Sequence, residues 1–557
     1  MKQELKTCQN CKKEFVIEPD DFDFYQKIKV PPPTWCPECR FKRQSLFRNE
    51  MTLYSRKCDF CKRSIISIYN PKSPYFVYCS ECWHSDKWDP FSFGQDYNPR
   101  RPFFEQLKEL LLRAPKEATY SSSFSKNINS EYINFAGSKE GMKNCYLVFN
   151  AGDCEDVMYS RGIRGARDTL DTYYGTKLER CYEIVNVEES TGIIFGQNVS
   201  GSLDSIFVLN ARGCQNCFGC VNLRYKNYHF FNEPLSKEEY KKRVSEIMGS
   251  YQKMQKARKR FEEFALKFPR RENNNLKTVN SSGEFLFETK NVNQSFEITQ
   301  AENCKYLFFA KGAKESYDVI GFGYDSEFLL GTVSVGYSSR VIGSSSCDNS
   351  QNIEYCFGMK MSEHCLGCDG LKNAKYAILN KRYEKDEYQK IRAQIVDELK
   401  EKNLYGLSMP PELAPFAYNE AIGQDNLPLA KEEALAQGFR WEEDIQKTMD
   451  KETMKPEQIP DNIKDVPDNI VDEILVCITC GRNYKIIKPE LVFYRKMVLP
   501  VPRQCFNCRH IDRIRRRGPF KLYSRKCAKC GKAIQTTYAP DRPEIVYCET
   551  CYLKEVV

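Results

Sequence analysis

The sequence is poor in histidine and has no long apolar run. Four histidines occur among 557 residues, and none lies in a metalloprotease, deaminase or catalytic-triad motif. No glycine-rich phosphate-binding loop is present, and no segment approaches the roughly 18 apolar residues that a membrane-spanning helix needs. We therefore expect no membrane association and predict that the protein is not an enzyme of these classes.

The first residues, MKQELKTCQN, lack the apolar stretch of a secretory signal peptide. Cysteine, by contrast, is abundant, with 27 residues, and sixteen of them form CxxC pairs near the two ends of the chain. Thiols in such number are typical of a reducing compartment. We expect the protein to be cytoplasmic.

Two copies of one sequence module occur at the two ends of the chain. The hexapeptide LYSRKC occurs at Leu53–Cys58 and again at Leu522–Cys527, which lie 469 positions later. At this offset Cys8–Cys82 and Cys477–Cys551 align without a gap over 75 positions, of which 27 are identical. Each module therefore contains the same four CxxC pairs.

CxxC pairs taken two at a time are typical of structural zinc sites, because two tight turns supply the four thiolates of a tetrahedron. Sequential pairing predicts two sites in each module and four zinc ions in all. A crossed pairing and disulfide bonds are the alternatives. Each zinc site is worth on the order of 10–16 kcal/mol of binding energy that is also folding energy. The predicted ligands are Cys8, Cys11, Cys36, Cys39, Cys58, Cys61, Cys79, Cys82, Cys477, Cys480, Cys505, Cys508, Cys527, Cys530, Cys548 and Cys551.

Basic residues gather in both modules. The formal charge of +9 gives no argument for a nucleic-acid partner, because sixteen thiolates on four zinc ions would lower it by eight, to +1. Local basic clusters such as Arg513–Arg517 (RIRRR) do indicate a nucleic-acid partner, since cations neutralise phosphates while aromatic rings stack on unpaired bases. One alternative is that the cations offset the negative charge of the zinc thiolates. Another is that the LYSRKC repeat forms the turn into the second ribbon of each module. The predicted nucleic-acid contacts are Arg40, Arg48, Tyr54, Arg56, Lys57, Arg509, Arg513, Arg515, Arg516, Arg517, Tyr523, Arg525 and Lys526.

The middle of the chain contains short β-type runs at a spacing near twelve residues. This spacing predicts strands stacked as the rungs of a β-solenoid. The middle is also duplicated, because the segment from Cys217 aligns with the segment from Cys365 at an offset of 148. Cys214, Cys217, Cys220, Cys365 and Cys368 either pack between the rungs or bind metal.

We predict a mainly β fold in which paired zinc ribbons flank a duplicated β-solenoid with capping helices. Ser236 and Glu239 form a capping box at the start of one helix. The predicted parts are a double zinc-ribbon module (1–90), an amphipathic helix and connector (91–140), the first solenoid half (141–235), a basic helix (236–270), the second solenoid half (271–383), helices and a tail (384–450), an acidic, proline-containing linker (451–473) that tethers a mobile end, and the second double zinc-ribbon module (474–557).

Several of these segments carry a family resemblance. The block CQNCKKEFVIEPDDFDFYQKIKVPPPTWCPECR, Cys8–Arg40, resembles the zinc-ribbon domain of short bacterial proteins, some of which are fused to cold-shock modules. The longer pattern, with LFRNEMTLYSRKC, CFGCVNLRYKNY, PFAYNEAIGQ and PDRPEIVYCETCY, resembles a family of large uncharacterised proteins from candidate-phyla (Patescibacteria) bacteria. This resemblance implies zinc ribbons around a repetitive β middle and implies no activity. The acidic linker is longer than the pattern leads one to expect.

Together these features favour a non-catalytic zinc-binding protein with a β-solenoid scaffold that binds RNA or a ribonucleoprotein through its basic ribbons. A docking scaffold for other proteins is the first alternative, because ribbons and solenoids both present binding surfaces. A solenoid-based enzyme of unknown reaction is the second.

Overall fold

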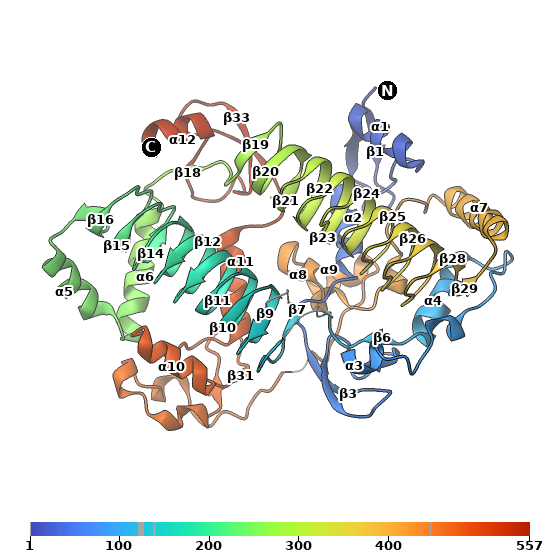
Figure 1. Ribbon diagram of the computed structural model, residues 1–557. Coiled ribbons are helices and arrows are strands. Elements are labelled where there is room, and N and C mark those ends of the chain that lie inside the picture. The colour runs from blue at the N-terminus through green and yellow to red at the C-terminus, as the bar shows by residue number, and fades with distance from the viewer. Residues whose placement is uncertain (1, 121–126, 137–140, 446, 557) are drawn as a thin grey trace. The chain divides into compact units, whose positions relative to one another are not determined.

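The computed structural model describes residues 2–120, 127–136, 141–445 and 447–556 (Figure 1). The chain is strand-rich, and two large sheets contain most of its strands. The chain divides into two compact units. Unit 1 comprises Met1–Thr119 and Asn273–Glu443, and unit 2 comprises Tyr120–Glu272 and Asp444–Val557.

The order of the units along the chain is interleaved. Unit 1 joins the N-terminal cysteine-rich module to the second large sheet, and unit 2 joins the first large sheet to the C-terminal module. The sequence-based division treated each module as a part of its own. The structure instead packs each module against the large sheet that is farther from it in sequence.

The first large sheet belongs to unit 2 and the second to unit 1. The strands of the first are β7 (Asn134–Ala136), β8 (Met142–Lys143), β9 (Tyr146–Ala151), β10 (Cys154–Arg164), β11 (Arg167–Glu179), β12 (Tyr182–Thr191), β13 (Ile194–Ser200), β14 (Ile206–Leu209), β15 (Gln215–Phe218), β16 (Asn227–Phe230) and β17 (Glu233–Pro234). The strands of the second are β19 (Leu276–Val279), β20 (Gly283–Asn293), β21 (Ser295–Thr299), β22 (Glu302–Ala310), β23 (Lys314–Phe322), β24 (Glu327–Val335), β25 (Ser339–Ile342), β26 (Gln351–Glu354), β27 (Glu363–Leu366), β28 (Lys375–Ile378) and β29 (Lys381–Arg382).

Neighbouring strands of both sheets pair in parallel at a nearly constant offset, except for the antiparallel last pairs, β16 with β17 and β28 with β29. Tyr182 lies opposite Ile194, Ile194 opposite Ile206, and Val341 opposite Ile353, so each step is twelve residues. The backbone adopts a left-handed φ at about every third residue, as at Asn216, Asn222, Tyr225 and Tyr228. The backbone bends at each of these residues, so the twelve residues between paired positions form a series of short straight segments.

Small apolar side chains fill the interior of each large sheet. Val157, Cys181, Ile193 and Cys217 belong to one buried cluster and lie at multiples of twelve residues from one another. Cys214 and Cys220 lie in the same cluster, and Cys365 and Cys368 lie in the corresponding cluster of the second sheet. The packing interpretation of these five cysteines therefore agrees with the structure.

Helices and short strands surround the sheets. The expected amphipathic helix is α4, in which Phe103, Leu107, Leu110 and Leu111 are buried. Ser236 caps α5 by accepting a hydrogen bond from the Glu239 backbone at 3.1 Å. None of the described helices has the length and apolar character needed to cross a bilayer. The helices are α1 (Pro19–Ile28), α2 (Pro37–Ser45), α3 (Ser80–Trp83), α4 (Phe103–Arg113), α5 (Lys237–Ile247), α6 (Tyr251–Ala265), α7 (Lys385–Glu401), α8 (Ile422–Asn426), α9 (Lys431–Ala436), α10 (Lys488–Lys496), α11 (Phe506–Arg517) and α12 (Glu549–Val556).

The short strands of the modules are mostly antiparallel hairpins, and two further pairs are parallel. The hairpins are β1 (Glu4–Thr7) with β2 (Glu14–Ile17), β3 (Tyr54–Lys57) with β4 (Ser64–Ser67), β30 (Leu475–Val476) with β31 (Asn483–Tyr484), and β32 (Tyr523–Lys526) with β33 (Ala533–Thr536). The parallel pairs are β5 (Val77–Tyr78) with β6 (Lys116–Glu117), and β18 (Arg270–Arg271) with β34 (Val546–Tyr547).

The acidic segment 451–473 is not a free tether, which corrects the sequence-based prediction. It forms three short 3₁₀ turns, Pro456–Gln458, Ile463–Asp465 and Asp468–Val471. Both of its PDNI motifs bury their isoleucine, and Ile470 is fully buried in the core of unit 2. The Asp461 carboxylate also accepts a hydrogen bond from the Gln252 backbone at the start of α6, at 2.9 Å. Apolar residues set among acidic ones anchor this segment.

Replacing Ile470 by alanine should destabilise unit 2 by about 2–5 kcal/mol, because the change leaves a cavity in a close-packed core. Val492→Ala is the matched control, since Val492 is 56% exposed and lies on α10 of the same unit. Urea unfolding followed by far-ultraviolet circular dichroism measures the difference. Equal stability of the two variants would mean that the segment is a loose linker.

Candidate metal centres

Four groups of four cysteines meet the geometric requirement for a metal site. Within each group every pair of sulfur atoms lies within 4.8 Å. The groups follow the sequential pairing predicted from the sequence, and the crossed pairing does not occur. They are Cys8, Cys11, Cys36 and Cys39; Cys58, Cys61, Cys79 and Cys82; Cys477, Cys480, Cys505 and Cys508; and Cys527, Cys530, Cys548 and Cys551.

The sulfur separations fit a tetrahedral ion better than a disulfide. The Sγ atoms of Cys11 and Cys36 are 3.7 Å apart, and those of Cys61 and Cys79 are 3.8 Å apart. The corresponding pairs of the second module are 3.7 and 3.8 Å apart. Zinc–sulfur bonds of about 2.3 Å in a tetrahedron give sulfur–sulfur edges of about 3.8 Å. A disulfide would place the atoms about 2.05 Å apart.

The first CxxC pair of each site sits on a hairpin turn with a left-handed residue directly after it. In the N-terminal module this residue is Lys12 or Lys62, with φ of 62° and 63°. In the C-terminal module the same positions hold Gly481 and Gly531, with φ of 71° and 76°. Glycine adopts this conformation without the steric cost that a side chain imposes. The turn geometry is thus the same in both modules, although the residues differ.

The second pair of each site lies at the beginning of a helix. Cys36 is the N-cap of α2, Cys505 is the N-cap of α11, and Cys79 is the N-cap of α3. The free backbone N–H groups and the dipole of a helix N-terminus favour thiolates there. Backbone amides also donate to the sulfurs, as from Cys36 to Cys8 Sγ at 3.2 Å and from Cys548 to Cys527 Sγ at 3.2 Å.

The charge around one site favours the thiolate form directly. The Arg63 guanidinium donates a hydrogen bond to Cys61 Sγ at 3.4 Å. This contact lowers the pKa of the Cys61 thiol to about 6. Metal ligands must lose their protons, and the Arg63 contact favours this at Cys61, whereas burial raises the pKa of Cys82 in the same group to about 12.

The helix of the first ribbon in each module, α2 or α11, places an arginine next to a metal-ligand cysteine and against a buried aspartate, and we call these two helices the ribbon helices. In unit 2, Arg509 follows Cys508 and its Nε lies 2.9 Å from Asp171 Oδ2 on β11. In unit 1, Arg40 follows Cys39 and its Nε lies 2.9 Å from Asp318 Oδ2 on β23. In both units the contacts of the ribbon helix run along two neighbouring strands of the sheet, which Figure 1 shows for α11 beside β11 and β12. We call these contacts the arginine clasps.

The clasp of unit 2 is the more highly charged. The Arg513 guanidinium is fully buried and lies 2.8 Å from both Asp171 Oδ1 and Glu183 Oε1. Arg516 binds the second oxygen of Glu183 at 2.8 Å. Nearby, Glu490 accepts hydrogen bonds from the Tyr494 and Tyr159 hydroxyls at 2.6 and 2.8 Å. Burial raises the pKa of Glu183 and of Glu490, so the nearby cations and hydroxyls stabilise carboxylates that would otherwise be costly to bury.

These contacts correct the predicted nucleic-acid surface. Arg40, Arg48, Tyr54, Arg509, Arg513 and Arg517 are buried inside their units. The hydroxyl of Tyr54 donates to Glu420 at 2.7 Å, and Arg517 donates to the Tyr173 hydroxyl at 2.7 Å. The arginines were predicted as surface residues because charge clusters are usually solvated. Arg40, Arg509 and Arg513 pair with acidic residues from the distant sheet, whereas Arg48 pairs with Glu50 of its own module. Only Arg515, Lys57 and Lys526 of the set are exposed.

The repeated hexapeptide has a structural explanation. Arg56 donates to the carbonyl oxygens of Asn70 and Tyr75 at 3.3 and 3.4 Å. Arg525 donates to the carbonyls of the two equivalent residues, Ala539 and Glu544, at 3.2 Å each. The arginine of LYSRKC therefore fastens the loop between the two CxxC pairs of the second ribbon. Lys57, Lys526 and the half-buried Tyr523 remain at the surface, where nucleic-acid contact is untested.

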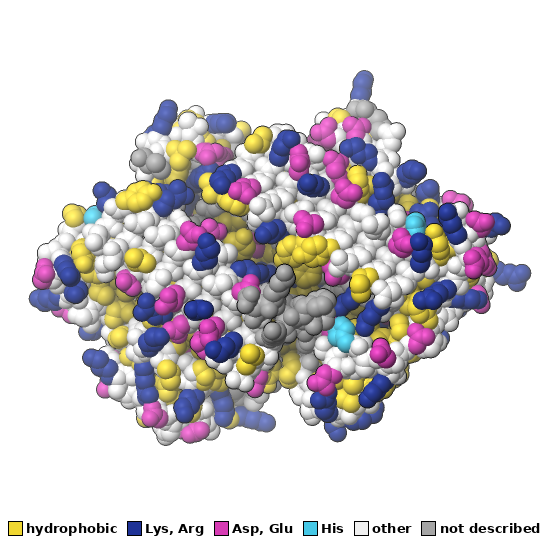
Figure 2. All heavy atoms as spheres, viewed as in Figure 1, with side chains coloured by type: hydrophobic (Ala, Val, Ile, Leu, Met, Phe, Trp, Pro, Cys, Tyr) yellow, Lys and Arg dark blue, Asp and Glu magenta, His cyan; other side chains and the backbone are white. Residues whose placement is uncertain are grey.

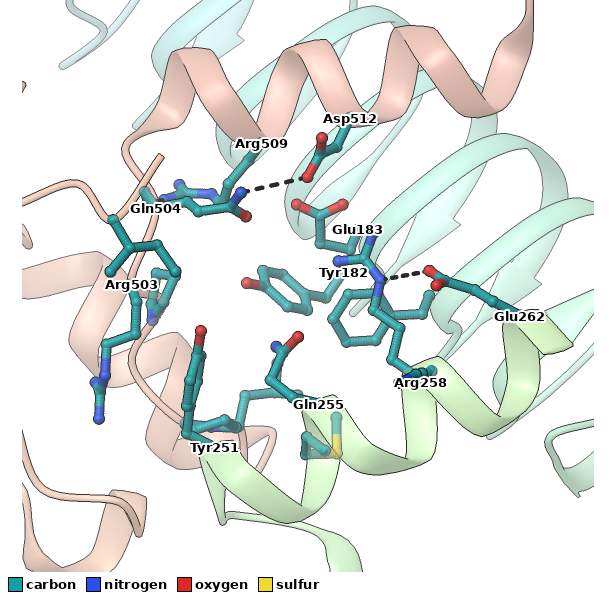
Figure 3. A pocket seen from close by; sticks show the side chains of 17 residues that line it. Tyr182, Glu183, Tyr251, Gln255, Arg258, Glu262, Arg503, Gln504, Arg509 and Asp512 are labelled. Carbon is teal, nitrogen blue, oxygen red and sulfur yellow. Dashed lines mark hydrogen bonds and ion pairs between the residues drawn. The ribbon is translucent and has the colours of Figure 1, made fainter. Parts of the chain in front are cut away.

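A cavity of about 310 Å³ adjoins the clasp of unit 2 (Figure 3). Helix α6 contributes Tyr251, Gln255, Arg258 and Glu262, the ribbon contributes Arg503, Gln504, Arg509 and Asp512, and β12 contributes Tyr182 and Glu183. Charges of both signs line it and pair locally, as Arg258 with Glu262 at 3.0 Å. Four cations and three carboxylates line the cavity, so its walls leave little net charge for a ligand to neutralise.

The comparisons with known proteins add no family. No protein-family model matches the chain, and no curated protein matches it. The functional conclusions below therefore rest on the geometry alone.

Removing one ligand should remove one ion. Cys508→Ala opens a four-cysteine group, so we expect the metal content of the purified chain to fall by one ion. Cys217→Ala is the matched control, because Cys217 is equally buried but packs inside the first large sheet. Elemental analysis with protein quantification measures the ratio. An unchanged metal content in Cys508→Ala would contradict the assignment of this group.

Replacing Arg513 by methionine should destabilise unit 2 by about 3–5 kcal/mol, because Asp171 and Glu183 would then be buried without their shared cation. Arg515→Met should change stability by less than about 0.5 kcal/mol, since the Arg515 side chain is 75% exposed.

The two units can be followed separately in this experiment. The four tryptophans, Trp35, Trp83, Trp88 and Trp441, all belong to unit 1. In urea, Arg513→Met should shift the circular-dichroism transition of unit 2 while the tryptophan-fluorescence transition stays in place. Wild-type behaviour of Arg513→Met in both signals would show that the clasp contributes little.

Proposed function

We propose that this protein is a structural zinc-binding scaffold made of two β-solenoid units, each braced by a pair of zinc ribbons. The observation that carries the proposal is the completeness of the four cysteine groups. Each supplies four sulfurs at tetrahedral separations, which leaves no open position for substrate or water. The ions then stabilise the fold and take no part in a reaction.

The twelve-residue offset and the recurring left-handed residues support the solenoid interpretation of the large sheets. Each strand pairs with the strand one step along the chain, as the coils of a solenoid do. The resemblance to the family of large proteins from candidate-phyla bacteria is in keeping with this architecture. The number of metal-ligand thiols favours a reducing cytoplasm.

Binding of RNA or a ribonucleoprotein through the ribbons remains a weaker candidate. Several of the arginines from which RNA binding was predicted are ion-paired with buried aspartates in the clasps. On the face in Figure 2, Lys and Arg side chains are interspersed with Asp and Glu. Docking of other proteins on the scaffold is compatible with the fold, and no described contact identifies a partner.

Metal analysis and chelation test the proposal. We expect four zinc ions per chain and a colourless protein, whereas iron bound to thiolates would absorb visible light. Removing the ions with a strong chelator should unfold both units, because the ribbon helices that hold the clasps begin at metal-ligand cysteines. Circular dichroism and tryptophan fluorescence measure the loss. Fewer than four ions, or a fold that survives their removal unchanged, would overturn the proposal.

A further inference from the structure

A row of five side chains lines one side of a groove in unit 1. Phe328, Arg340, Asn352, His364 and Tyr376 are the second residues of the successive strands β24 to β28 and lie twelve residues apart. All five adopt a left-handed φ, between 52° and 55°. Their side chains therefore leave equivalent bends of the sheet, about 4.8 Å apart from strand to strand. We call this row the side-chain ladder, and it spans about 19 Å.

The ladder is rich in planar groups that contact one another. The His364 and Tyr376 rings stack with centroids 5.2 Å apart, and the Arg340 guanidinium lies 5.0 Å from the centre of the Phe328 ring. His364 and Tyr376 are only partly buried, so part of their ring surface is open to the groove. Burial lowers the pKa of His364, which favours the neutral imidazole at neutral pH. Such rings and amides suit a flat heteroaromatic partner.

The opposite wall of the groove is cationic. It includes Lys385, Arg392 and Lys400 of α7, together with Lys27 and Lys29 at the end of α1. Among the described residues that line the groove, Glu354 is the one acid, and Arg392 and the Tyr405 hydroxyl already bind it at 2.6 and 2.9 Å. Arg340 and Lys385 are exposed and have no described carboxylate within ion-pair distance. Lys27 is already paired with Glu315 at 2.9 Å. The positive charge that no described carboxylate neutralises therefore includes that of Arg340 and Lys385.

The size of the groove suits a small organic anion. Its volume is about 680 Å³, which lies within the range of roughly 300–1,000 Å³ typical of small-ligand sites. A ligand that filled it would meet planar side chains on one wall and ammonium and guanidinium groups on the other. A planar base joined to phosphate groups has this combination of properties, and an acidic peptide lacks the planar ring.

The duplicated half of the chain offers an internal comparison. At an offset of 148 residues, the ladder positions hold Arg180, Gly192, Asp204, Asn216 and Tyr228. An added Cβ at Gly192 would stand 2.4 Å from Asp204 Oδ1, so an acidic side chain covers that bend. The position of Arg392 holds Val244. The same backbone frame therefore carries neither the aromatic start of the ladder nor the facing arginine.

From these observations we infer that the groove between the side-chain ladder and α7 binds a nucleotide, either free or as a unit of single-stranded RNA. The phosphates contact Arg340 and Lys385, and the base packs on the His364 and Tyr376 rings. This site contains none of the metal-ligand cysteines, although Lys27–Lys29 of the first ribbon lies at its edge, so it goes beyond the scaffold function.

Equilibrium binding to the zinc-loaded full chain tests the inference with three probes: ATP, inorganic tripolyphosphate and a short, labelled single-stranded RNA. We expect ATP or the RNA to bind more tightly than tripolyphosphate, because only these two present a base. Tighter binding of ATP identifies a free nucleotide as the ligand, and tighter binding of the RNA identifies a nucleic-acid segment.

Charge reversal locates the site. Arg340→Glu combined with Lys385→Glu should weaken binding about ten- to a hundredfold, because charge-assisted contacts to phosphate are lost. The fold should tolerate Lys385→Glu alone, since an acidic residue is favourable in the first turn of a helix. Lys237→Glu is the matched control, because Lys237 occupies the equivalent position at the start of α5. It should bind as the wild type does.

Tyr376→Ala separates base recognition from simple anion binding. We expect it to weaken ATP or RNA binding at least severalfold and to leave tripolyphosphate binding unchanged. The inference is overturned if none of the probes binds, if tripolyphosphate binds as tightly as ATP and RNA, or if the double charge reversal behaves like Lys237→Glu.

Discussion

The contact between a ribbon-helix arginine and a buried sheet aspartate determines how the chain is organised. Arg40 with Asp318 and Arg509 with Asp171 join residues that are hundreds of positions apart, and each arginine directly follows a metal-ligand cysteine. A buried ion pair gains stability only when its geometry is held accurately. A metal ion in the cysteine group would supply that accuracy, because the tetrahedron would fix the first turn of the helix from which the arginine projects. On the function proposed above, metal binding and packing of the module on the sheet are one coupled event.

This coupling explains why the two units are interleaved. Each module packs on the large sheet that is farther from it in sequence. Each unit is therefore built from two stretches of chain that are separated by a stretch of the other unit. Contacts of such long sequence separation carry a large loop-closure cost. Buried charge favours the correct partner in this situation, because a module without its aspartate would bury an unpaired guanidinium. Unit 2, with Arg513 and Arg516 on Glu183, has the stronger form of this selectivity.

The sequence predicted the local features better than the distant ones. The cysteine groups and their pairing were readable, because the duplicated CxxC spacing encodes metal geometry directly. The twelve-residue step was readable because β-type runs recur along the sequence at this spacing. The clasps were not, since RIRRR looks the same whether Arg513 faces solvent or Asp171. The signal that was present lay in the sheet, where Asp171 and Asp318 are each the fifth residue of their strand. The segment 451–473 was wrongly predicted to be a free tether, because its acidic composition outweighed the apolar Ile463 and Ile470, which are buried.

The duplication shows which positions the fold constrains and which it leaves free. The metal-ligand cysteines and the clasp pairs keep their chemistry in both units, because a change there would leave a thiolate or a buried charge without a partner. The bends whose side chains reach the surface differ in this respect from the buried bends at Asp171, Glu183 and Asp318, which hold the clasp carboxylates. At the surface bends the side chains point outward from a left-handed backbone, and the strand pairing that holds the bend does not depend on them. Phe328, Arg340 and His364 stand at such bends in unit 1, and the corresponding residues of unit 2 are Arg180, Gly192 and Asn216. The parallel strand pairing beneath them is the same. A ligand site can arise on this frame at little cost to stability, and the bends above β24 to β28 are therefore the place where the two units acquire different surfaces.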